Sequence, residues 1–225
     1  MTDPALEALQ WGPDIPTEDR LRLLGPVEDQ RVLELGCRPP HGSVALALRG
    51  AKVTSVDHTS ERLTAVRRLA AEADVKVTVR QGDFADLAFA RNDSIDLAYS
   101  VNALDEVHDL GRVFRQASRV LIQDGALVVS LPHPAFAMVD PDSSDPVMVT
   151  RRYGESPEPD VEGVVPRTYT HTIAEVHTAF ERANFRVDTI IEPAATSAGH
   201  RSPRWVPAMG WIPPTVVMRG RKLGV

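Results

Sequence analysis

Four short apolar runs in the first half of the chain each end at a small or polar residue that could contact a ligand. The first run ends at Gly36, and the second ends at Asp57, 21 residues later. A carboxylate at about this spacing can accept hydrogen bonds from both hydroxyls of a ribose. The third and fourth runs end at Asp83 and Ser100. The pattern therefore predicts a site for a ligand that carries a ribose.

The elements that position these residues are predicted to be strands of a parallel sheet. Between residues 31 and 131, short β-branched runs alternate with helical patterns, which is typical of right-handed βαβ units. Ligand sites in open α/β sheets lie beyond the carboxyl ends of the strands, so the four run ends should share one edge. We expect strands near residues 32–35, 53–56, 76–79, 95–99 and 127–129, and helices near 42–49, 60–73 and 110–121.

The second half of the chain begins with a long segment that lacks this pattern. Residues 132–169 are rich in Pro, Asp, Ser and Arg, and twelve of the 18 prolines lie at or beyond Pro132. So long an irregular segment in a compact chain is usually a lid, a binding loop or disordered. Order resumes at Thr172, where Thr-x-x-Glu has the form of a capping box. We expect a helix from about 173 to 183 and strands at 185–191 and 215–218.

Length and composition predict one domain that carries an insertion. The chain has 225 residues, of which 43% are apolar and 25% charged, and a single core commonly serves a chain of this size. We divide residues 1–225 into an N-terminal cover (1–30), a ligand-binding core (31–131), a substrate lid (132–171), and a C-terminal helix with two strands (172–225).

The charge and the cysteine count exclude several classes of protein. The 25 Lys and Arg against 31 Asp and Glu leave a net charge of -6, which disfavours a nucleic acid or an anionic membrane as partner. The single cysteine, Cys37, cannot form a disulfide framework or a multi-thiolate metal site, and we predict no metal site. The absence of a signal-peptide pattern and of an apolar run near ~20 residues predicts a cytoplasmic protein.

Taken in order, the strand-end motifs resemble those of the class I S-adenosylmethionine-dependent methyltransferases, in particular their small-molecule branch. The resemblance covers residues 31 to 131, and residues 172–219 fit the family's closing helix and two strands. It implies an α/β fold, a doubly wound three-layer Rossmann-like seven-stranded sheet with its last strand antiparallel, and S-adenosyl-L-methionine as cofactor. The segments that carry it are Val32 to Cys37, Val53 to Asp57, Gln81-Gly82-Asp83, Asp96 to Ser100, and Val113 to Leu121 before Asp124-Gly125.

The resemblance also implies which residues bind the cofactor. The broken N-terminal segment Gln10 to Pro16 looks too polar for a core element, and its Trp11 stands where this branch has an aromatic cover. The other implied contacts are the methionyl part on the loop from Gly36 through Arg38, the ribose on Asp57 with His58, the adenine between Asp83 and Phe84, and the sulfonium beside Ser100 and Val101.

The loop after Gly36 departs from the family pattern. Arg38 and Pro40 occupy positions where the family repeats glycine. An arginine with a left-handed backbone would cost about 1–2 kcal/mol and would project its side chain near the pocket. Arg38 either points outward, pairs with the carboxylate of the cofactor's methionine, or fills the site. In the last case the protein would be a degenerate methyltransferase-like binding or scaffolding protein, which is the alternative function.

Methyl transfer requires in-line positioning of the acceptor, and a general base only where the acceptor carries a proton of high pKa. We expect a small organic acceptor and three candidate catalytic residues, His133 after the fifth strand, His171 before the next helix, and His108 after the fourth strand. The His-Pro at His133 and the motif Tyr169-Thr170-His171 resemble motifs that border the substrate cleft in related enzymes. The oligomeric state cannot be deduced from these patterns.

Two other enzyme classes fit the sequence less well. A dinucleotide oxidoreductase would require Gly-x-Gly-x-x-Gly, and Arg38-Pro39-Pro40 leaves no glycine-rich nest for a pyrophosphate. A metal-dependent transferase would require clustered carboxylates, and Asp105 with Glu106 is too little to indicate one.

Overall fold

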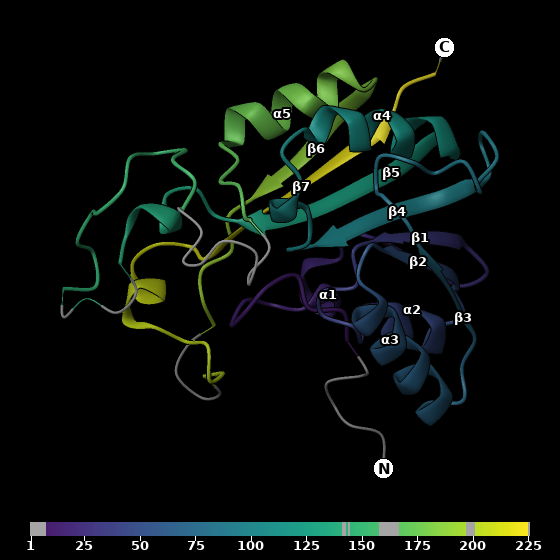
Figure 1. Ribbon diagram of the computed structural model, residues 1–225, viewed down its shortest axis with the longest axis horizontal. Coiled ribbons are helices and arrows are strands. Elements are labelled where there is room, and N and C mark those ends of the chain that lie inside the picture. The colour runs from purple at the N-terminus through teal and green to yellow at the C-terminus, as the bar shows by residue number, and fades with distance from the viewer. Residues whose placement is uncertain (1–7, 141–142, 144, 158–166, 197–200, 225) are drawn as a thin grey trace.

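A single mixed β-sheet organises the part of the chain that the computed structural model describes, residues 8–140, 143, 145–157, 167–196 and 201–224 (Figure 1). Parts of the expected N-terminal cover (1–7) and lid (141–142, 144 and 158–166) lie outside the described residues. The sheet order is β3-β2-β1-β4-β5-β7-β6. The strands are β1 (Arg31–Leu35), β2 (Lys52–Asp57), β3 (Val77–Gln81), β4 (Ile95–Val101), β5 (Leu121–Pro132), β6 (Phe185–Ile191) and β7 (Thr215–Lys222).

The direction of the strands confirms the predicted topology. Strand β1 pairs in parallel with β2 and β4, β2 with β3, and β4 with β5. The last strand, β7, runs antiparallel to both β5 and β6. Because β1 to β5 are parallel, their carboxyl ends meet at one edge of the sheet, which brings Gly36, Asp57 and Asn102 together.

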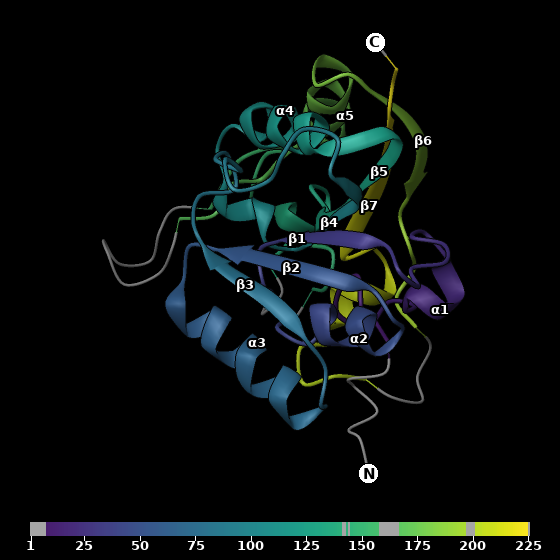
Figure 2. The same ribbon diagram turned by 90° about the vertical axis from the view of Figure 1, so that its right-hand side faces the viewer.

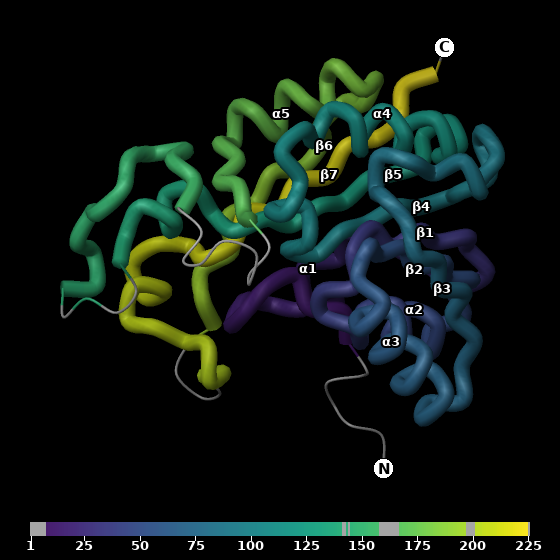
Figure 3. The backbone as a smooth tube through the Cα atoms, viewed as in Figure 1, coloured from purple at the N-terminus to yellow at the C-terminus, as the bar shows by residue number. Residues whose placement is uncertain are grey.

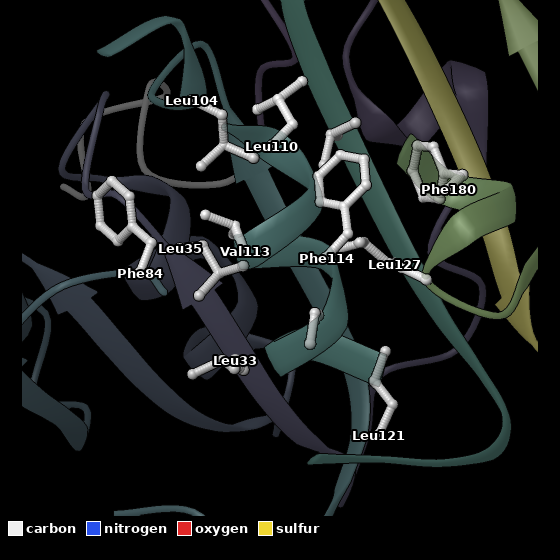
Figure 4. Packing of buried hydrophobic residues seen from close by; sticks show 14 of the residues in the cluster. Leu33, Leu35, Phe84, Leu104, Leu110, Val113, Phe114, Leu121, Leu127 and Phe180 are labelled. Carbon is white, nitrogen blue, oxygen red and sulfur yellow. The ribbon is translucent and has the colours of Figure 1, made fainter. Parts of the chain in front are cut away.

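Helices cover both faces of the sheet and form the three expected layers (Figure 2). On one face, α4 and α5 pack against strands β1, β4 and β5, and the Phe114 and Phe180 rings lie 4.5 Å apart between their centroids. Figure 4 shows this packing, with Leu33 and Leu35 of β1 directed toward Val113 of α4. The opposite face carries α1, α2 and α3. The helices are α1 (Glu18–Leu21), α2 (Gly42–Leu48), α3 (Ser60–Glu72), α4 (Leu110–Val120) and α5 (Ile173–Arg182).

The N-terminal segment differs from its expected place. We judged it too polar for the core, and this prediction is wrong, because Trp11 is fully buried in the cluster on the α1 face. The indole Nε1 donates to Glu18 Oε2 at 2.9 Å. The same carboxylate accepts the backbone N–H groups of Leu23 and Leu24 at 3.1 and 2.7 Å. Burial of this irregular segment is possible because Glu18 satisfies its polar groups.

Two element boundaries also differ from the expected ones. We expected the fifth strand to begin after a turn at Asp124-Gly125, but β5 begins at Leu121, directly after α4. Asp124 has a φ of 61°, and the pairing of β5 with β4 shifts register between Ile95 and Leu97. β5 therefore continues through Asp124 and Gly125, where the strand is locally irregular. Helix α3 begins at Ser60 as expected, but its N-cap residue is Thr59 and not Ser60.

Two irregular segments, with described residues 133–140, 143 and 145–157 in the first and 193–196 and 201–214 in the second, extend from the same edge of the sheet (Figure 3). They are joined where the His133 N–H donates to the Pro214 carbonyl at 3.0 Å. The second segment is also joined to the N-terminal segment, because Asp14 accepts the N–H and hydroxyl of Ser202 at 2.7 and 2.6 Å. In the described residues, no helix combines the length and the apolar character needed to cross a bilayer.

Candidate functional site

Gly36 is the first residue after β1, and its backbone conformation requires glycine. Its φ is 84°, in the left-handed region. A Cβ added here would lie 2.2 Å from the Ala103 Cβ on the segment that follows β4. The Gly36 N–H donates to the Val56 carbonyl at 2.8 Å, which holds the loop against β2. The glycine therefore lets the chain segments that follow β1 and β4 approach each other closely.

Asp57 ends β2 and is fully buried beneath this loop. Its Oδ2 accepts the Cys37 N–H at 2.8 Å, and its Oδ1 accepts the Thr59 N–H at 2.8 Å. Asp57 thus joins the loop after β1 to the start of α3. Arg62, one turn into α3, has its Nη1 3.6 Å from Asp57 Oδ2.

An ion-pair network lies over these strand ends and centres on Glu106. Arg62 makes two bonds to the Glu106 carboxylate, at 2.7 and 3.0 Å. The Arg38 Nη2 donates to Glu106 Oε1 at 2.5 Å, and the His58 Nε2 lies 3.3 Å from Oε2. Burial by itself would raise the pKa of Glu106, but the hydrogen bonds and charges of Arg62 and Arg38 outweigh it and lower this pKa. Glu106 is therefore a charged anchor for both arginines.

Arg38 crosses the site from the loop after β1 to the residues after β4. Its backbone is outside the left-handed region, so the strain that we considered for an arginine here is absent. The Nη1 donates to the Asn102 carbonyl at 3.2 Å and lies 3.5 Å from Asp105 Oδ2. Burial raises the pKa of the Asp105 carboxyl, and the positive charge of Arg38 opposes this effect.

Two buried acceptors beside Arg38 have no hydrogen-bond partner. They are Asn102 Oδ1 and Asp105 Oδ1, and each side-chain atom is shielded from solvent. A buried polar atom without a partner costs free energy, commonly ~1–3 kcal/mol. Such atoms at the end of a parallel strand are suited to accept hydrogen bonds from a polar ligand.

The remaining predicted cofactor residues lie at the same edge but differ in exposure. The Phe84 ring is buried, and the His58 ring meets it edge-on at 5.7 Å between centroids. Asp83 is exposed beside a hollow of about 460 Å³, and its Oδ1 accepts the Ala85 N–H at 2.8 Å, as in a turn. Ser100 is fully buried and donates to the Leu35 carbonyl at 2.6 Å, and Val101 is also buried.

The three predicted catalytic histidines fall into two places. His108 and His171 both lie near Tyr169, with ring centroids 5.0 and 6.5 Å from the tyrosine ring. His108 and His171 line a hollow of about 580 Å³ between α4 and α5. The buried His171 ring donates from Nε2 to the Val107 carbonyl at 2.8 Å, and burial lowers its pKa. His171 is therefore a neutral imidazole at pH 7.

His133 lies apart from this pair, at the start of the irregular segment after β5. Its Nδ1 accepts the Ala135 N–H at 3.1 Å, so its Nε2 carries the proton and donates to Glu192 Oε1 at 2.8 Å. Both ring nitrogens therefore have protein partners. These contacts suit a histidine that holds the turn at the base of the segment.

Two groups of residues at this edge were not anticipated from the sequence. The Arg62 and Glu106 pair was missed because its members are 44 residues apart in the chain. Glu34 was missed although it interrupts the apolar run of β1, which is a visible signal. It is buried and accepts a hydrogen bond from the Tyr99 hydroxyl at 2.8 Å. Burial raises the pKa of Glu34 to about 7. Cys37 is also buried, and burial raises the pKa of its thiol and keeps it protonated.

Comparisons with known proteins agree with this fold. Residues 33–129 match the family model described as a methyltransferase domain. The chain is similar to a ubiquinone biosynthesis O-methyltransferase of Azorhizobium caulinodans, with 31% identity over 109 residues, which are 48% of this chain and 43% of that protein. A protein of the same name from Xanthomonas oryzae is 32% identical over 100 residues, which are 44% of this chain and 42% of that one. The chain therefore matches less than half the length of these relatives.

Solved structures extend the similarity over the whole fold. An S-adenosylmethionine-dependent methyltransferase from Mesorhizobium loti superposes with a TM-score of 0.73 and 25% identity, covering 91% of this chain and 96% of that one. A SAM-dependent methyltransferase from Aquifex aeolicus has a TM-score of 0.63 and 15% identity, covering 98% and 94% of the two chains, and shares the fold.

The strand order, the antiparallel last strand and the glycine and carboxylate at the strand ends define a Rossmann-like methyltransferase fold. Residues 33–129 therefore carry a methyltransferase domain, and the whole fold is similar to that of S-adenosylmethionine-dependent methyltransferases. This similarity implies S-adenosylmethionine as the cofactor.

The residues after β1 and β4 fit the amino-acid end of this cofactor. That end carries one carboxylate and one ammonium group. The Arg38 guanidinium is a fork of donors suited to a carboxylate, and the unpartnered Asn102 Oδ1 and Asp105 Oδ1 are acceptors suited to an ammonium. The donor set therefore matches a zwitterion and would not match a pyrophosphate.

Proposed function

We propose that this protein transfers a methyl group from S-adenosylmethionine to a small organic acceptor. The observation that carries the proposal is that a left-handed glycine, a buried carboxylate and a donor fork meet at the carboxyl edge of a methyltransferase-type sheet. When bound, the cofactor supplies a sulfonium-activated methyl group that an in-line nucleophile can accept. The protein's part is to hold the two reactants in line and to exclude water.

Within this proposal, residues at different strand ends bind different parts of the cofactor. Gly36 and Arg38 would hold the amino-acid end, Asp57 with His58 the ribose, and Asp83 with Phe84 the adenine. The Asp57 carboxylate is covered in the free protein, and it would reach the ribose when its 3.6 Å contact with Arg62 opens while Arg62 keeps its two bonds to Glu106. Ser100 and Val101 would support the sulfonium from within the sheet. Trp11 would act through Tyr99, which its ring meets edge-on at 6.3 Å.

The name of the similar ubiquinone biosynthesis enzymes favours an oxygen acceptor, and we extend this preference to the present chain. An alcohol or phenol must lose a proton during transfer, which calls for a general base. Of the three candidates, His108 and His171 suit this role best, since they line a hollow between α4 and α5. His133 is the weaker candidate, because both of its ring nitrogens have protein partners.

We further propose that residues 132–171 are a substrate lid on a single cytoplasmic domain. The position of its described residues at the carboxyl edge and the composition of the segment support this role. The single cysteine of the chain supports the proposed cytoplasmic location, because proteins of this reducing compartment rarely contain disulfides.

Calorimetric titration with S-adenosylhomocysteine, the expected product, tests the proposed function. We expect saturable binding to the native protein and weaker binding to Arg38→Gly. No heat with either protein would exclude the cofactor. Binding only after the substitution would favour the degenerate alternative, in which Arg38 fills the site.

A further inference from the structure

Arg38 occupies a glycine position of the family and bonds to a carboxylate across the site. We propose that Arg38 exchanges Glu106 for the carboxylate of the cofactor's amino-acid end, and so selects adenosyl ligands that carry this carboxylate. The inference rests on the proposed function and assigns a specificity-determining role to Arg38. Glu106 is then the partner that holds Arg38 in place in the free protein.

Glu106 can release Arg38 without becoming an unpaired buried charge. Its side chain is only 4% exposed, so losing every partner would be strongly destabilising. Arg62 holds the same carboxylate through two bonds, and His58 lies beside it. These contacts remain when Arg38 leaves, which keeps Glu106 neutralised.

Arg38 is also the more exposed of the two arginines. Its side chain is 34% exposed, against 20% for Arg62, and Arg62 contacts Asp57 as well as Glu106. Pro39 and Pro40 follow Arg38 and restrict the backbone of the loop. Exchange therefore requires rotation of one side chain, with little change of the loop.

The charged and polar groups around Arg38 suit a zwitterionic ligand better than a ligand that carries only a negative charge. A lone anion would meet the Asp105 carboxylate, which lies 3.5 Å from Arg38 Nη1. An amino acid brings an ammonium group together with its carboxylate. The buried Asn102 Oδ1 and Asp105 Oδ1, which lack partners, can accept hydrogen bonds from that ammonium. Both ends of the ligand are then satisfied by residues that already lie together.

The test compares S-adenosylhomocysteine with its decarboxylated analogue, which lacks only the carboxylate. Calorimetry would be run on the native protein, Arg38→Leu and Glu106→Gln. We expect the native protein to bind S-adenosylhomocysteine about tenfold or more tightly than the analogue, from one charge-assisted pair. Arg38→Leu should reduce this preference to about twofold or less. Glu106→Gln should tighten S-adenosylhomocysteine binding, because Arg38 no longer has to leave a carboxylate.

Arg31→Leu is the matched control, because Arg31 forms a comparable pair with Asp96 at 2.6 Å at the opposite end of the strands. It should keep the native preference. Thermal melts identify variants that fail to fold, and Arg38→Lys, which retains the charge but not the fork, then supplies the second measurement with an intermediate preference expected.

The outcomes separate the two proposals. Equal preference for the carboxylate in the native protein and in the folded Arg38 variants would overturn the exchange and leave the methyltransferase proposal standing. A native protein that binds both ligands equally would have the same consequence. Absence of S-adenosylhomocysteine binding in every protein would overturn both proposals.

Discussion

Glu34 is the fourth residue of β1 and carries a buried carboxyl group next to the loop that we propose to bind the cofactor. Its pKa is raised from 4.5 to about 7 by burial, although Tyr99 and Ser55 stabilise the charged form. The folded state therefore prefers the protonated carboxyl. At pH 4.5 and below, both folded and unfolded chains bind the proton. Between pH 4.5 and 7, only the folded chain holds it, so stability falls as pH rises.

We predict that Glu34→Gln removes this loss. Relative to the native protein, the variant should gain about 3 kcal/mol in its free energy of unfolding between pH 4.5 and 8, since each pKa unit is worth about 1.4 kcal/mol. Urea denaturation at both pH values measures the change. Glu72→Gln, at a half-exposed position on α3, is the control and should follow the native protein. Parallel pH curves for Glu34→Gln and the native protein would contradict the raised pKa.

His133 provides a second prediction at the residue scale. Because Ala135 and Glu192 use both ring nitrogens, we expect His133→Ala to lose about 1–2 kcal/mol of stability through two lost hydrogen bonds. His133→Asn should retain most of it, since an amide offers both an acceptor and a donor. Denaturant unfolding compares the variants, and S-adenosylhomocysteine binding should be unchanged in both. If Asn were as destabilising as Ala, the turn role would be wrong.

At the scale of single elements, α5 shows how local sequence directs structure. Its first turn contains the capping box expected from Thr-x-x-Glu, in which Thr172 accepts the Glu175 N–H at 3.2 Å and Glu175 accepts the Thr172 N–H at 2.8 Å. The helix positions Phe180 against Phe114 of α4, so capping and core packing act on the same element. Helix α5 could be predicted because its capping residues and the apolar residues of its buried face lie within one continuous segment of the sequence.

We predict that Thr172→Ala destabilises the protein by about 1 kcal/mol, the usual effect of removing an N-cap side chain. Thr178→Ala serves as the control, because Thr178 is exposed on the same helix and caps nothing. Thermal or urea unfolding provides the measurement. An equal loss in both variants would show that helix propensity, and not the cap, determines the effect.

At the scale of the whole molecule, the C-terminal strands complete the sheet that the first half begins. Residues Ala126 to Pro132 of β5 pair with Arg221 to Thr215 of β7. The family match at residues 33–129 ends within β5, whereas the structural similarity covers 91% of the chain. The cofactor half therefore depends on a strand from the opposite end of the chain.

We predict that a fragment ending at Pro132 does not fold cooperatively. It would expose one edge of β5 and remove Phe180 and Phe185 from the core. Circular dichroism during heating should give no sigmoidal transition for the fragment and a clear one for the full chain. A cooperative transition in the fragment would contradict this interdependence.

The sequence by itself determined the order of the elements and the edge at which Gly36 and Asp57 meet. These features follow from local periodicity and from the rule that parallel strands share their carboxyl edge, and both are readable along a continuous segment. Local patterns did not predict the burial of Trp11. Its burial depends on Glu18, whose carboxylate accepts hydrogen bonds from the indole and from the backbone of Leu23 and Leu24.

Only the tertiary structure decided which side chains meet at that edge. Arg38 and Glu106 are 68 residues apart, and His133 and Glu192 are 59 apart. Whether such pairs form depends on the path of each loop and on competition between partners, which no spacing in the sequence encodes. For Arg38 the structure shows an arrangement that none of the three open possibilities described, a side chain directed across the site and paired with Glu106.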